Sequence, residues 1–144
     1  MKKLLIILCI CSVFILTGCG ITFGSDSSKV DEIAEAGEKL GTAFTDAKLI
    51  FSKLEEKKSL SSDDQKEIDQ QISQLREVID NFKAADAPFL VKKAKEAAME
   101  EINKKEEILI EIQERAKNGE AKPEDLKLLV KTVKEDFEIK LWDK

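Results

Sequence analysis

Apolar residues recur at alternating steps of three and four from Val30 onward, with polar residues between them. The first run predicts one long helix, whose inner face comprises Val30, Ile33, Gly37, Leu40, Phe44, Ala47, Phe51 and Leu54. This spacing is typical of a helix that buries one stripe against its neighbours. Ser27 or Ser28 is expected to cap its start. Gly37 and Gly41 are interpreted as points where a neighbouring helix comes close, with local softness of the helix as the alternative.

Three further runs have the same spacing and are separated by short connections. The second begins at Ser61 or Ser62, and its inner face comprises Ile68, Ile72, Leu75, Ile79 and Phe82. The third follows Ala87-Pro88 and stops at Asn118-Gly119, and its inner face comprises Val91, Ala94, Ala98, Ile102, Leu109, Ile112 and Ala116. The fourth begins at Pro123, and its inner face comprises Leu126, Leu129, Val130, Val133, Phe137 and Leu141.

Four amphipathic helices joined by short connections predict an all-α fold, because each apolar stripe must be buried against another helix. The default arrangement is an antiparallel bundle of four helices. The alternative is a three-helix core with a docked fourth helix. No sequence repeat relates the four helices beyond their shared periodicity.

The residues before the first helix have a different pattern. Lys2 and Lys3 precede an apolar stretch from Leu4 to Leu16, which ends in Leu16-Thr17-Gly18-Cys19. A positive start, an apolar stretch and small residues before the processing point are the parts of a secretory signal peptide. The apolar stretch, at about 13 residues, is shorter than the roughly 20 that a membrane-spanning helix needs.

The ending Leu16-Thr17-Gly18-Cys19 resembles the lipobox of bacterial lipoproteins. This resemblance covers only Met1 to Cys19, and it implies cleavage before Cys19 and attachment of a diacylglyceryl group to its sulfur. The chain would then comprise a signal peptide (1–18), a lipidated cysteine with a flexible tether (19–28) and a helical domain (29–144). We expect the protein to be anchored in the cell membrane on its extracytoplasmic face.

The composition after residue 18 argues against several classes of function. The chain has no histidine or tyrosine and no cysteine beyond Cys19, so the side chains that most often serve as bases, nucleophiles and soft metal ligands are missing. We expect neither an enzyme nor a metal site nor a cofactor. The net charge of −5 becomes −7 once Lys2 and Lys3 are removed, which disfavours a nucleic-acid partner.

A tethered bundle without catalytic residues favours a module that binds a protein or a cell-envelope component. In architecture alone it is similar to small helical cell-wall-binding lipoproteins and prophage exclusion lipoproteins. The alternative is a carrier or sensor that holds a small ligand or amphiphile in the bundle interior, for which a cavity of about 300 Å³ or more would be needed.

The last predicted helix has a second apolar side. Leu128, Ile139 and Trp142 fall about 180° to 240° from Val133 on a helical wheel, away from the inner face. We interpret these three residues as a candidate partner contact, with Trp142 as its anchor, because tryptophan is enriched among interface hot spots. The alternative is that the bundle buries both sides of this helix.

Lys105 and two clusters of lysines each have two possible roles. Lys105 interrupts the inner face of the third helix, and we expect it to extend along the edge of that face into water. A buried polar group in a binding groove is the alternative. Two clusters, Lys92-Lys93-Lys95 and Lys53-Lys57-Lys58, are expected to be solvated surface, with contact to anionic polymer or lipid headgroups as the alternative.

Overall fold

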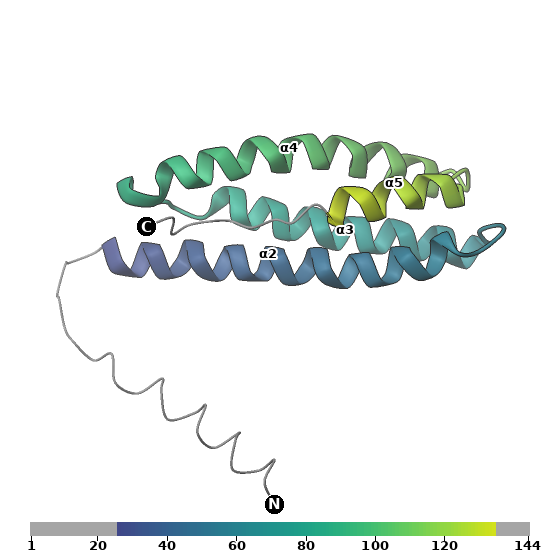
Figure 1. Ribbon diagram of the computed structural model, residues 1–144, viewed down its shortest axis with the longest axis horizontal. Coiled ribbons are helices and arrows are strands. Elements are labelled where there is room, and N and C mark those ends of the chain that lie inside the picture. The colour runs from purple at the N-terminus through teal and green to yellow at the C-terminus, as the bar shows by residue number, and fades with distance from the viewer. Residues whose placement is uncertain (1–25, 135–144) are drawn as a thin grey trace, which may run out of the picture.

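The computed structural model describes the backbone of residues 26–134 and the side chains of residues 28–133. Four helices follow one another in this range: α2 (Asp26–Glu55), α3 (Ser62–Ala84), α4 (Phe89–Lys117) and α5 (Pro123–Lys134) (Figure 1). No strand occurs between residues 26 and 134. The predicted all-α class is therefore confirmed.

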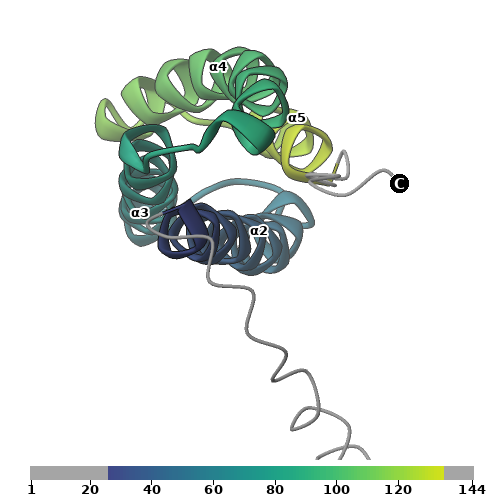
Figure 2. The same ribbon diagram turned by 90° about the vertical axis from the view of Figure 1, so that its left-hand side faces the viewer.

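The helices run alternately up and down and surround a common interior (Figures 1 and 2). Helix α2 packs against α3 and α5, while α4 packs against α3 and, over a smaller area, against α5. Because α5 packs against α2 at least as closely as α3 does, it is a full member of the bundle. The predicted antiparallel four-helix bundle is confirmed.

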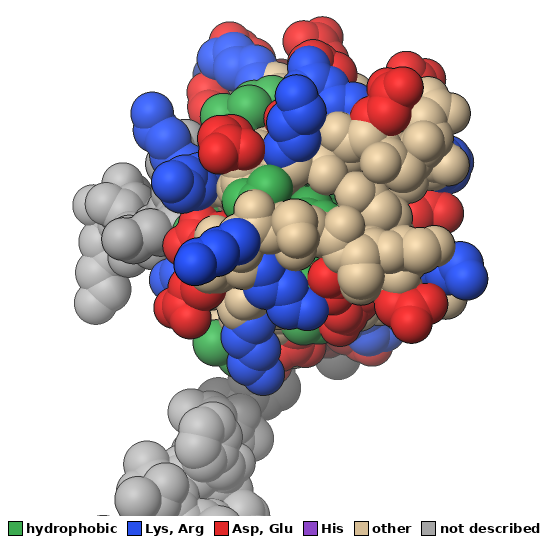
Figure 3. Space-filling model, turned by 90° about the vertical axis from the view of Figure 1, so that its right-hand side faces the viewer, with side chains coloured by type: hydrophobic (Ala, Val, Ile, Leu, Met, Phe, Trp, Pro, Cys, Tyr) green, Lys and Arg blue, Asp and Glu red, His purple; other side chains and the backbone are tan. Residues whose placement is uncertain are grey.

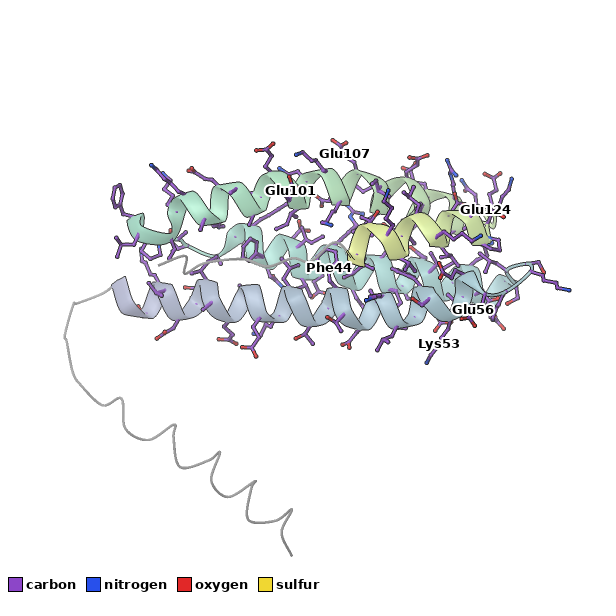
Figure 4. The ribbon with its side chains drawn as sticks, in the orientation of Figure 1. Phe44, Lys53, Glu56, Glu101, Glu107 and Glu124 are labelled. Atoms are coloured by element: carbon purple, nitrogen blue, oxygen red, sulfur yellow. The ribbon has the colours of Figure 1, made fainter. Side chains whose placement is uncertain are left out.

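Most of the inner-face residues predicted from the periodicity form the core, whereas Val30, Gly37 and Ala94 are only half-buried and do not belong to it. Each helix contributes side chains that are almost completely buried, among them Leu40, Phe51, Ile68, Ile72, Ile79, Phe82, Ile102, Leu109, Leu126 and Leu129. Figure 4 shows Phe44 pointing into the bundle, whereas the labelled charged side chains on α2, α4 and α5 point outward. Leu49, which lies off the seam of α2, is 58% exposed.

Two local predictions for α2 differ from the structure, the second of them at Gly41. The helix begins at Asp26, so Ser27 and Ser28 lie inside its first turn rather than before it. A Cβ atom built on Gly41 would meet nothing within 4 Å, so no neighbouring helix approaches closely there. The predicted inner residues Phe137 and Leu141 lie outside the residues that the structure describes.

The start of α3 carries the predicted cap. Ser61 accepts a hydrogen bond from the backbone N–H of Asp64, and Asp64 accepts one from the backbone N–H of Ser61, which together form a capping box. Lys57 Nζ lies 2.6 Å from Asp64 Oδ1. The bond from Lys57, together with the Ser61 N–H, lowers the pKa of Asp64 from 3.8 to about 2.

The end of α4 is the predicted glycine stop. Gly119 has a φ of 72°, a left-handed conformation that glycine adopts without steric cost. Its N–H donates to Ala116, and the N–H of Glu120 donates to Arg115 at 2.8 Å. This is a Schellman motif, which satisfies the last carbonyls of the helix and turns the chain toward α5.

Two buried glutamines connect α3 to α4 and to the connection between α4 and α5. Gln65, in the first turn of α3, donates to the carbonyl of Ala121 and accepts from its N–H, at 2.8 and 3.2 Å. Gln113, on α4, donates to Asp69 and Ser73 of α3 and accepts a bond from Arg76. Because a buried amide is costly unless it is paired, these contacts fix how the helices are aligned.

Candidate functional site

The start of α2 lies at the same end of the bundle as the connection between α3 and α4 (Figure 1). Lys29 on α2 forms an ion pair with Asp86 in that connection at 2.5 Å, and its hydrogen bond lowers the pKa of Asp86. We call this the proximal end, because in sequence it is the end nearest to Cys19. The opposite, distal end holds the α2–α3 and α4–α5 connections.

The proximal end exposes two large apolar side chains. Phe89 and Leu90, the first two residues of α4, are each 88% exposed, and we call this pair the apolar tip. Helices α3 and α5 have acidic residues in their first turns, but the first turn of α4 has none, and its N-cap, Pro88, makes no side-chain capping bond. The apolar tip is therefore an exception among the helix starts of this bundle.

The apolar tip was not predicted from the sequence. Phe89 and Leu90 directly follow Pro88 and lie outside the inner face that begins with Val91, which is buried. Two consecutive large apolar residues at a helix start, off its buried face, are the pattern that could have revealed them. Single exposed apolar residues are common, whereas an adjacent pair so fully exposed is a candidate contact surface.

The lysines beside the apolar tip have different roles. Lys95 donates to the carbonyls of Lys83 and Ala85 at the end of α3, and its ammonium lies 5.9 Å from the centre of the Phe82 ring. It thus satisfies carbonyls that the helix end leaves unpaired. Lys92 and Lys93 are exposed, and neither forms an ion pair within the part of the chain that the structure describes. Within this cluster, only Lys92 and Lys93 agree with the expected solvated surface.

In the other predicted lysine cluster, Lys53 and Lys58 are exposed, while Lys57 pairs with Asp64. That pair belongs to the cap of α3 at the distal end. Figure 3 shows the distal end, where charged and other polar groups cover most of the surface and hydrophobic side chains take up little of it. The two ends of the bundle therefore differ in character, since the proximal end carries the apolar tip.

A groove of about 700 Å³ lies beside the apolar tip, at the corner between α3 and α4. It is open to solvent and lies outside the bundle interior. Its lining mixes lysines, acids and small apolar side chains, including Lys92, Glu96, Glu100 and Met99. Lys83, also in the lining, forms an ion pair with Glu106. With opposite charges balanced around it, the groove shows no preference for one kind of ligand.

The predicted partner contact on the last helix is described in part. Leu128 is 44% exposed, whereas its neighbours Leu126 and Leu129 are buried. Its side chain therefore lies on the outer side of α5, as the wheel predicted. Ile139 and Trp142 lie outside the described residues, as does Cys19.

The structure contradicts the prediction for Lys105. Instead of reaching water, it is only 7% exposed and donates to the backbone carbonyl of Thr132 in the last turn of α5. Lys105 therefore joins α4 to α5 through this hydrogen bond.

Neither a metal centre nor a membrane-spanning helix is found between residues 26 and 134. In this range no three side chains of the kinds that bind metals gather into one group. None of the helices α2 to α5 combines the length and the apolar character needed to cross a membrane. Comparison with protein-family models, with curated proteins and with solved structures finds no match to the chain.

Proposed function

We propose that this chain is a lipid-anchored, extracytoplasmic protein whose helical bundle binds a protein or a cell-envelope component without catalysing a reaction. The observation that carries the proposal is the Leu16-Thr17-Gly18-Cys19 ending of the apolar N-terminal stretch. Once residues 1–18 are removed, Cys19 is the one thiol of the chain. Two or more acyl chains hold a protein stably at a bilayer, whereas one holds it only marginally.

The geometry of the bundle supports a tethered module. Cys19 lies seven residues before Asp26, where α2 begins, and seven residues span at most about 25 Å. An anchor at Cys19 would therefore hold the proximal end near the bilayer. The remaining faces of α2, α4 and α5, which carry the outward-pointing charged side chains of Figure 4, would be accessible to a partner.

The proposed partner contact consists of Leu128, Ile139 and Trp142. Trp142→Ala should weaken partner binding more than it lowers the free energy of unfolding, because an interface tryptophan supplies much of the contact energy. Leu49→Ala is a matched control, since Leu49 is an exposed apolar residue on another helix. A large drop in melting temperature with unchanged affinity would assign Trp142 to the core and remove this contact.

The alternative of a small-ligand carrier has less support. Such a carrier would use the bundle interior, where the largest side chains are fully buried, including Phe51 and Phe82. The groove near the apolar tip lies outside that interior. We therefore place the binding activity on the surface of the bundle.

Metabolic labelling with a fatty acid tests the anchor. Wild-type protein should take up label, whereas Cys19→Ala should not. Cys11→Ala is the matched control, because Cys11 lies in the segment that is removed, and it should be labelled like the wild type. Equal labelling of the Cys19→Ala variant would refute the proposed anchor.

A further inference from the structure

The apolar tip has no role in the fold. Phe89 and Leu90 are each 88% exposed, so they contribute little to the packing of the bundle. Removing such side chains from water is favourable in proportion to their apolar area. They lie at the start of α4, at the proximal end of the bundle, where α2 also begins (Figure 1).

We infer that the apolar tip inserts into the surface of a bilayer that contains anionic phospholipids, so that the bundle stands on the membrane through its proximal end. This inference rests on the proposed lipid anchor, because the distance of at most about 25 Å between Cys19 and Asp26 keeps the tip near the bilayer. Tethering at that distance replaces a weak association from solution by an intramolecular one.

The charges around the tip favour contact between an anionic bilayer and the α4 side of the proximal end. Lys92 and Lys93 are exposed near the start of α4, where Glu96 is the one exposed acid among the first eight residues of the helix. Asp86 is paired with Lys29. On α2, Asp31 and Glu32 are exposed and acidic, and an anionic surface repels them. The bundle should therefore meet the bilayer with the start of α4 leading, because lysines close to an anionic surface add to the attraction.

A bilayer fits the tip better than a protein does. A protein contact that is stable by itself buries about 800 Å² on each partner around a closely packed centre, whereas two adjacent side chains provide a much smaller area. A bilayer needs no such area, since the anchor already supplies the binding. Insertion of two apolar side chains beside lysines then fixes the orientation of the bundle.

Single cysteines provide a direct test with the full, lipidated chain, because no other thiol follows Cys19. Leu90→Cys, Leu49→Cys and Leu128→Cys place the same substitution at three exposed positions, of which Leu90 alone belongs to the tip. Each variant is labelled with an environment-sensitive fluorophore and reconstituted into vesicles of phosphatidylcholine, with or without phosphatidylglycerol. A nitroxide on the lipid chains and iodide in the water then report the location of the label.

We expect the label at position 90 to be quenched by the lipid-borne nitroxide several-fold more than the labels at 49 and 128, and to be shielded from iodide. Phosphatidylglycerol should strengthen this difference. Lys92→Glu with Lys93→Glu should lower the equilibrium constant for insertion of the tip by about fivefold for each lysine, so that most of this difference is lost. Lys127→Glu with Lys131→Glu, exposed lysines on α5, should leave it unchanged.

Equal accessibility of all three labels in protein that does associate with vesicles would overturn the inference while leaving the anchor intact. Protein that carries no lipid would instead refute the proposed function. A label at position 90 that is shielded in native membranes but not in pure lipid vesicles would assign the tip to a protein partner, and this too would overturn the inference.

Discussion

Asp64 couples the stability of the bundle to pH. Its carboxylate accepts bonds from Lys57 and from the Ser61 N–H, and these lower its pKa from 3.8 to about 2. A group whose pKa is lower in the folded protein stabilises the fold above its unfolded pKa. Each pKa unit corresponds to about 1.4 kcal/mol, so the upper limit of the contribution is about 2.5 kcal/mol.

Solvent lowers this limit, because the Lys57 side chain is 47% exposed. We therefore expect Asp64→Asn to lower the free energy of unfolding by about 1 to 2 kcal/mol at pH 7. The asparagine retains a side-chain oxygen that can accept the Ser61 N–H, so the substitution tests the charge. Lys66→Gln is a control, since Lys66 lies in the same helix and is largely exposed.

Urea unfolding at several pH values measures the effect. The difference between wild type and Asp64→Asn should be complete above about pH 5 and should shrink as the pH falls from about 4, with most of it lost at about pH 2. The direction of this pH dependence follows from protonation. In acid the wild type loses the charge on Asp64, so it no longer differs from Asp64→Asn in charge at this position. A difference that stays constant between pH 7 and pH 2 would refute the assignment of this stability to ionised Asp64.

Three further predictions concern the core and the ends of the bundle. Phe51→Ala should lower the free energy of unfolding by about 3 to 5 kcal/mol, because the ring is fully buried; a loss below about 1 kcal/mol in urea unfolding would contradict its place in the core. Gln65→Leu should cost about 2 to 4 kcal/mol, since it leaves both backbone groups of Ala121 unpaired, and an unchanged urea midpoint would contradict this. Residues 25–144 without lipid should give a helical circular dichroism spectrum; a disordered spectrum would mean that the apolar stripes need a partner.

The inner faces could be predicted from the sequence because helical periodicity is a local property. Residues three or four apart share a side of the helix whatever surrounds it. Phe44, Phe51 and Phe82 were therefore assigned to the core correctly. Ser61 and Gly119 were also recognised, since capping and left-handed turns depend on a few neighbouring residues.

Lys105 was predicted wrongly because its environment depends on a helix that is distant in sequence. From α4 alone, a lysine between Ile102 and Leu109 is expected to reach water. The last turn of α5 passes beside it instead and presents the carbonyl of Thr132. The hydrogen bond to this carbonyl offsets part of the cost of burying the ammonium.

The apolar tip was missed for a related reason. The periodicity of α4 identifies Val91 as an inner residue, but it does not tell whether residues before it are covered by another element. Coverage depends on how far each neighbouring helix extends. The exposure of Phe89 and Leu90 therefore became visible only in the assembled bundle.

If Cys19 anchors the bundle to a bilayer, mass spectrometry of membrane-purified protein should find an N-terminal peptide that begins at Cys19 and carries a diacylglyceryl group on its sulfur. A peptide that runs through Gly18 into an unmodified Cys19 would show that the chain is neither cleaved before Cys19 nor lipidated there.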